Sequence, residues 1–141
     1  MLIRAFYAGT VSGIVLGLLL KWAENLTEKK VYTLLLNVDF IPVIGDVQWN
    51  EGVEFLFHLC ISWMIAFLFA VLLNRSRIAV KHPYLTALLL TIPTIPLYFP
   101  LTILAIKETP AVDDYYAIFL WIAAHLLYAL VLAGSYRRQT S

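Results

Sequence analysis

Residues 55–73 read FLFHLCISWMIAFLFAVLL, and this stretch decides the fold. It has no formally charged side chain, follows Glu51 and Glu54, and is followed by Arg75 and Arg77. A helix of this length, rising about 1.5 Å per residue, crosses the roughly 30 Å hydrocarbon core of a bilayer. The stretch therefore predicts a transmembrane helix.

Three further apolar runs of similar length predict three more crossings. Helices are expected over residues 5–23, 53–73, 83–106 and 115–136, the last ending near Gly134. The chain of 141 residues is 62% hydrophobic and 13% charged, whereas soluble domains are about half apolar and a quarter charged. We therefore expect one all-α membrane domain over residues 1–141, built as a four-helix bundle. The one cysteine, Cys60, excludes an intrachain disulfide.

The first and third runs carry special packing signals. Gly9, Gly13 and Gly17 recur every four residues and place a strip almost without side chains on one helical face, which allows close helix packing in lipid. The sequence leaves open whether the strip contacts its own bundle, another copy or a partner membrane protein. In the third run, three prolines predict a kinked or unwound middle: Pro93, Pro96 and Pro100.

The segment between the first two runs leaves the hydrocarbon for about thirty residues. Val31, Leu34, Leu35 and Val38 follow helical spacing, which predicts a short amphipathic helix on the membrane surface or capping the bundle. Residues 40–46 are apolar but contain Pro42 and Gly45, as is typical of an irregular loop.

The charges predict the orientation in the membrane. With an inner N-terminus, six cations and no acid lie inside: Arg4, Arg75, Arg77, Lys81, Arg137 and Arg138. All nine acids then lie outside, together with Lys21, Lys29, Lys30 and Lys107. The positive-inside rule therefore predicts that both termini are cytoplasmic.

The chain resembles small bacterial inner-membrane proteins of the YagU and YqhR type. The resemblance rests on the glycine-rich segment 13–17 leading to Lys21 and Trp22, on the long outer loop, and on the segment 125–134, HLLYALVLAG. It extends loosely over the whole chain. It implies a four-helix protein of the bacterial plasma membrane, linked to stress tolerance, and supplies no catalytic residues.

Polar residues on two of the predicted helices are the candidate site. Glu51, Glu54, His58 and Ser62 form one stripe, and Asp114, Trp121, His125 and Tyr128 share a face of the last helix. Both acidic ends lie on the outer side, and ionisable groups at membrane depth are functional candidates by default. Histidine exchanges protons near neutrality. These residues suggest an outer acidic vestibule that leads to two histidines and serves a cation or proton pathway.

Other interpretations of these residues stay open. A histidine bonded to a neighbouring helix is ordinary packing in a bundle. A second interpretation is ligation of one haem by His58 and His125. A third is a metal site of Glu54, His58 and Asp114, which offer usable ligand types without a known spacing signature.

The main expectation from the sequence is a non-enzymatic component of the plasma membrane. It would act through contacts of the glycine strip, without cofactor, metal or nucleic-acid partner, because no phosphate-binding loop, nucleophile elbow or paired metal motif is present. The alternative is a small cation or proton permeation protein.

Overall fold

The computed structural model describes residues 1–138, and these contain helices and no strands. Four segments are long and apolar enough to cross a membrane: Leu2–Thr27, Glu51–Arg75, Pro83–Ile103 and Tyr115–Arg137. The predicted all-α membrane fold with four spans is confirmed. The last helix, α7 (Tyr115–Arg138), continues through Gly134 rather than ending there, because one glycine weakens a helix by only about 1 kcal/mol and does not break it.

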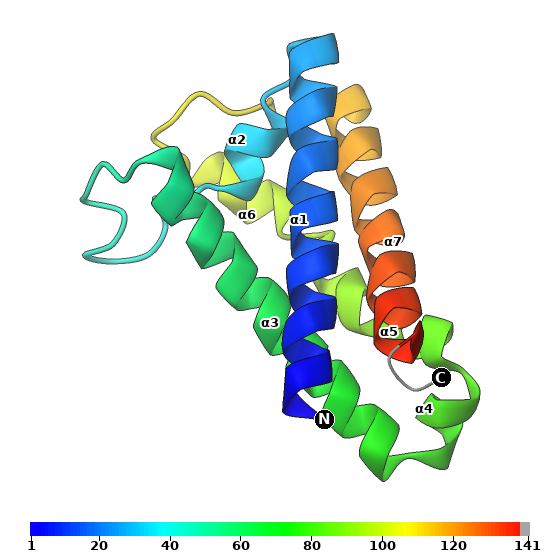
Figure 1. The fold of residues 1–141 in the computed structure, drawn as a ribbon. Coiled ribbons are helices and arrows are strands. Elements are labelled where there is room, and N and C mark those ends of the chain that lie inside the picture. Colours follow the sequence, from blue (N-terminus) through cyan, green and yellow to red (C-terminus); the bar gives the residue numbers. More distant parts are fainter. Residues whose placement is uncertain (139–141) are drawn as a thin grey trace.

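Helix α1 (Leu2–Thr27) is the central helix of the bundle. It packs against α3 (Glu51–Arg75) on one side and against α7 on the other, while α5 (Pro83–Thr91) covers another face of α7. Figure 1 shows α1 and α7 side by side and α3 crossing α1 obliquely. The oblique path of α3 sets the shape of the site described below.

The glycine strip of α1 forms the seam with α3. A Cβ atom at Gly9 would lie 3.0 Å from the Cβ of Ala66, and one at Gly13 would lie 3.0 Å from the Cβ of Ser62. At Gly17 the ring of Phe55 occupies the space. The strip is therefore covered within its own chain, and the surface that was expected to be available to a second copy or partner is already occupied by α3.

The third span is broken at its prolines. Helix α5 ends at Thr91, a 3₁₀ turn η1 (Ile92–Thr94) contains Pro93, and α6 (Tyr98–Ile103) begins two residues after Pro96. Pro100 instead lies in the first turn of α6, where a backbone N–H has no helical partner in any case. The break thus lies at the first two prolines and turns α6 toward α2.

Helix α2 (Val31–Leu35) caps the bundle and is shorter than expected. Its Val31 and Leu34 are fully buried, and it contacts α1, α6 and α7. The Glu24 carboxylate accepts hydrogen bonds from the backbone N–H groups of Tyr32 and Thr33, each at 2.9 Å. Because a helix of five residues is marginal alone, these bonds and the buried side chains hold it in place.

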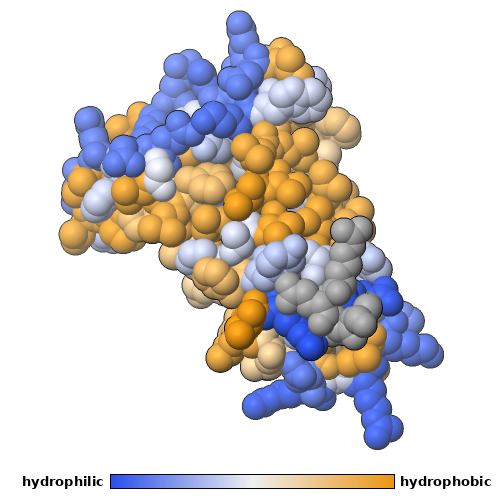
Figure 2. All heavy atoms as spheres, in the orientation of Figure 1, coloured by the Kyte–Doolittle hydropathy of each residue, from blue (hydrophilic) through white to orange (hydrophobic). Residues whose placement is uncertain are grey.

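The surface divides into two hydrophilic ends and an apolar band. Figure 2 shows this division, with the orange band between two blue regions. The start of α1, the last turns of α7 and the basic helix α4 (Arg77–Lys81) lie at one end, while α2 and the loop before α3 lie at the other (Figure 1). The two ends match the separation of charges in the sequence.

Candidate functional site

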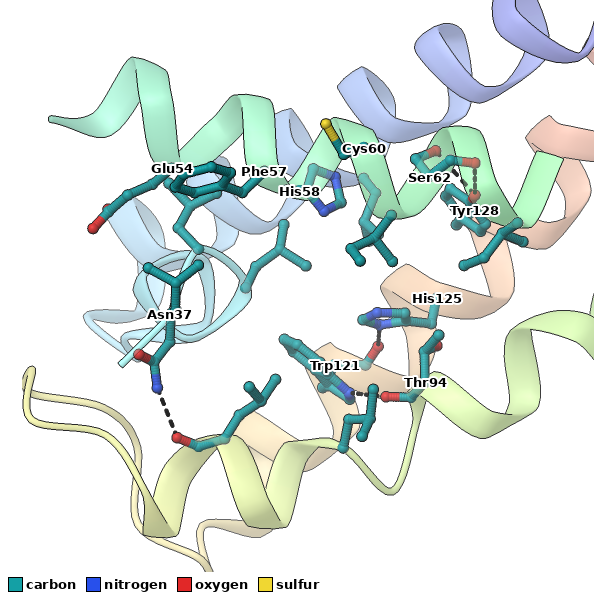
Figure 3. A pocket seen from close by; sticks show the side chains of 18 of the residues that line it. Asn37, Glu54, Phe57, His58, Cys60, Ser62, Thr94, Trp121, His125 and Tyr128 are labelled. Atoms are coloured by element: carbon teal, nitrogen blue, oxygen red, sulfur yellow. Dashed lines mark hydrogen bonds between the residues drawn. The ribbon is translucent and has the colours of Figure 1, made fainter. Parts of the chain in front are cut away.

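A cavity of about 320 Å³ opens between α3, α6, α7 and the segment that follows α2. Most of its lining is aliphatic or aromatic, and polar side chains enter it from α3 and α7. Figure 3 shows Phe57 and His58 of α3 across the space from Trp121 and His125 of α7. Its volume lies at the lower end of the range for small-molecule sites, about 300–1,000 Å³.

Helices α3 and α7 meet at one side of the cavity through Ser62 and Tyr128. The Ser62 hydroxyl donates to the carbonyl of Gly9 at 2.7 Å and lies 3.0 Å from the Tyr128 hydroxyl. A serine hydroxyl has one hydrogen to donate, so Tyr128 is the donor to Ser62. Both side chains are almost completely buried. This contact ties α1, α3 and α7 together and closes the cavity there.

Residues 35–41 cover the cavity at the end near α2. The Asn37 side-chain amide donates to the carbonyl of Leu101 at 2.8 Å. The Asp39 carboxylate accepts from the backbone N–H groups of Ile106 and Lys107 at 2.7 and 3.1 Å. The covering segment is therefore fastened to α6 and to the loop that follows it.

Each histidine binds one backbone carbonyl through one ring nitrogen. His58 Nε2 lies 3.0 Å from the Gly13 oxygen, and His125 Nδ1 lies 2.8 Å from the Trp121 oxygen. A carbonyl only accepts, so these nitrogens carry the hydrogen, and in the neutral ring the other nitrogen is an acceptor. Neither His58 Nδ1 nor His125 Nε2 has a hydrogen-bond partner among residues 1–138. The cavity thus contains two side chains with an unused acceptor.

The acids at this end of the bundle are paired with lysines. Glu54, which is 7% exposed and lines the cavity, is bound by Lys107. Glu51 is bound by Lys21 and accepts from the Tyr32 hydroxyl at 2.9 Å. Burial, and then this bond to Glu51, raise the pKa of the Tyr32 phenol.

Asp114 pairs with Lys29 at 2.6 Å and accepts from the Ala117 backbone N–H at 3.0 Å, which makes it the cap of α7. The Lys29 ammonium, followed by the Ala117 amide, lowers the pKa of the Asp114 carboxyl.

The structure brings together five of the seven acid, histidine and hydroxyl candidates, and Trp121, which shares the α7 face, also lines the cavity. Glu54, His58, Ser62, His125 and Tyr128 line the cavity. Glu51 instead lies against a separate hollow near Gly17 and Tyr32, and Asp114 lies at the start of α7 outside the cavity lining.

The hypothetical metal set of Glu54, His58 and Asp114 is not assembled, because each acid is bound to a lysine on another element. Within residues 1–138 no three His, Cys, Asp or Glu side chains gather where they would hold a metal ion. Bis-histidine binding of haem stays a prediction.

Sequence reasoning missed the covering segment and the lysine partners. Asn37 is one polar residue in the apolar run 34–38, a signal that a specific partner is needed. Each of the four outer lysines has an acid within reach in the fold: Lys21, Lys29, Lys30 and Lys107. Their pairing depends on contacts across the chain, which helical spacing does not predict.

Comparison of the chain with protein-family models, with curated protein sequences and with solved structures finds no match.

Proposed function

We propose that this integral membrane protein is a non-enzymatic binding protein that receives a lipid-soluble ligand from the side, within the bilayer. The carrying observation is the cavity between α3 and α7, which is mostly apolar and is lined in part by exposed apolar side chains of the spanning segments. Ile61 and Leu97 line the cavity and are also 54% and 47% exposed. Such exposed apolar side chains at the level of the spanning helices face lipid tails, so a ligand dissolved in the membrane enters without crossing water.

The alternative of a cation or proton pathway has less support. An acidic vestibule would need carboxylates available to cations, whereas Glu51, Glu54 and Asp114 are each bound to a lysine. The contact between Ser62 and Tyr128 also lies between the histidines and the opposite end of the bundle. A hydrated path from one end to the other has no support in these contacts.

The charges of the two ends support an orientation with both termini in the cytoplasm of a bacterial plasma membrane. In that orientation, α2 and the covered end of the cavity face outward. The resemblance to the YagU and YqhR type, and the role in stress tolerance that it implies, remain predictions of the sequence.

Trp121 provides an intrinsic probe of binding. It is 2% exposed and lines the cavity, so a ligand with bromine atoms near its head group quenches its fluorescence on contact. The full chain in lipid nanodiscs is titrated with stearyl alcohol brominated near the hydroxyl end. We expect saturable quenching, which Trp121→Phe removes.

Matched variants separate cavity binding from general contact with lipid. Ile61→Phe adds volume at the mouth and is expected to weaken quenching, whereas Met64→Phe changes an exposed residue of α3 outside the cavity lining and is expected to have no effect. Quenching that does not saturate, or that survives Ile61→Phe unchanged, contradicts the proposed function. In vesicles, cation flux above that of empty vesicles would favour the permeation alternative.

A further inference from the structure

We infer that the ligand of the cavity is a neutral lipid with a hydroxyl head group, which donates a hydrogen bond to His125 or His58. This inference rests on the proposed function and names the ligand class. It depends on the charge of the cavity, on the unused histidine acceptors and on the depth of the two rings.

The charge of the cavity excludes ionic head groups. The one formally charged side chain among its lining residues is Glu54, which Lys107 already neutralises. Among the side chains that the structure describes, no lysine or arginine lines the cavity. A phosphate or carboxylate moved from water into such surroundings loses its hydration without gaining a cationic partner, and burial of an unpaired charge is costly.

The unpaired acceptor nitrogens of the two histidines favour a ligand that donates a hydrogen bond over one that only accepts. His125 is 4% exposed, and its Nδ1 hydrogen is bound to Trp121. His58 donates its Nε2 hydrogen to Gly13. Each neutral ring is left with an acceptor nitrogen, so a hydroxyl can donate to it, while the oxygen of an ether or a ketone finds no hydrogen there.

The side chains around the histidines do not supply the missing donor. Trp121, which lies 4.4 Å from His125 between ring centroids, donates its own N–H to the carbonyl of Thr94 at 3.3 Å. The Tyr128 hydroxyl donates to Ser62. Among the described residues no side chain supplies this donor, so it comes from a molecule that occupies the cavity, and a hydroxyl head group is one that can.

The depth of the rings favours a small head group. His58 lies seven residues after Glu51 and His125 ten residues after Tyr115, which puts them about 10 and 15 Å along their helices. A head group that reaches them leaves the water interface. A single hydroxyl loses the least hydration and recovers part of it in the new hydrogen bond, while the chain extends past Ile61 and Leu97 toward lipid.

The test compares three ligands with the same chain on the wild-type protein. Stearyl alcohol, its methyl ether and the corresponding methyl ketone, all brominated near the head group, are titrated by quenching of Trp121 in nanodiscs. One hydrogen bond to a neutral acceptor predicts that the alcohol binds about three- to tenfold more tightly than the ether or the ketone. The comparison on the wild type needs no variant and does not depend on the folding of a mutant.

A double variant then assigns the preference to the histidines. In His58→Phe/His125→Phe, checked for native helix content and melting, the alcohol and the ether are expected to bind equally. Equal binding of all three ligands to the wild type overturns this inference but leaves the proposed function intact. Absence of saturable quenching by any ligand defeats the proposed function itself. A preference for the alcohol that persists in the double variant overturns the role of the histidines.

Discussion

Two glycine-to-alanine substitutions in different helices test whether α1 and α3 are in the close contact described. Gly13 lies in α1 and Gly134 in α7, and both are helical. A Cβ atom at Gly13 would lie 2.8 Å from Leu59 Cδ2 and 3.0 Å from both Cβ and Oγ of Ser62. A Cβ atom at Gly134 would meet its nearest neighbour, the Tyr84 hydroxyl, only at 3.9 Å. Both substitutions therefore reduce the conformational freedom of the unfolded backbone in the same way, but only Gly13→Ala brings the new methyl group into close contact with neighbouring atoms.

The expected magnitudes follow from these contacts. Replacing a helical glycine by alanine stabilises a helix by about 0.5–1 kcal/mol, and Gly134→Ala is expected to show this gain. At Gly13 the leucine end can rotate, but Ser62 is held by its bond to Gly9. Overpacking costs about 1–3 kcal/mol. Gly13→Ala is therefore expected to be about 1–3 kcal/mol less stable than Gly134→Ala.

Unfolding in mixtures of mild and denaturing detergent, followed by far-UV circular dichroism, measures this difference. The wild type and both variants are compared at several detergent ratios. If the two alanine variants are equally stable, the close approach of α1 and α3 at Gly13 is refuted. A larger residue at Gly13 should increase the loss, because the neighbouring helix has to move away.

Three further expectations concern the hydrogen bonds and ion pairs. The pKa of Asp114 is lowered from its ordinary value of 3.8, so its carboxylate stabilises the fold at pH values above 3.8, and this stabilisation is lost as the pH falls through the pKa of the folded state. Asp114→Asn should cost less than about 1 kcal/mol at neutral pH, and in a pH series the difference in melting temperature between variant and wild type should close below pH 3.8. Ser62→Ala should destabilise the protein more than Tyr128→Phe, because it removes both the bond to the Gly9 carbonyl and the hydroxyl acceptor of Tyr128, and leaves Tyr128 only the Ser62 backbone carbonyl at 3.4 Å. Tyr128→Phe removes one side-chain bond of about 0.6 kcal/mol in a membrane bundle; equal losses in the detergent assay would contradict this count of bonds. Glu24→Ala should speed hydrogen exchange of the amides of residues 31–35 as α2 frays, and Glu24→Gln should have a smaller effect, since one acceptor oxygen remains.

The spans were predictable because apolar runs of this length have one stable arrangement in lipid. The spacing of Gly9, Gly13 and Gly17 predicted that this face of α1 packs closely against another helix. Spacing alone does not name that helix. The structure supplies that partner through Ser62 and Ala66.

The cavity was not predictable from the sequence, because it arises from the angle between helices. Helical spacing placed His58 and Ser62 on one face, and His125 and Tyr128 on another. It did not reveal that α3 runs obliquely or that residues 35–41 fold back over the space. Nor did it reveal the lysine pairs, since Lys107 reaches Glu54 only after the broken third span has turned α6.

The position of α1 has a consequence for the order of assembly in time. Synthesis delivers α1 before α7, yet these two helices pack against each other along the bundle. Until α7 has been inserted, one flank of α1 is bordered by lipid tails, and the wall of the cavity that bears His125 does not yet exist. The cavity is therefore complete only once α7 has been inserted.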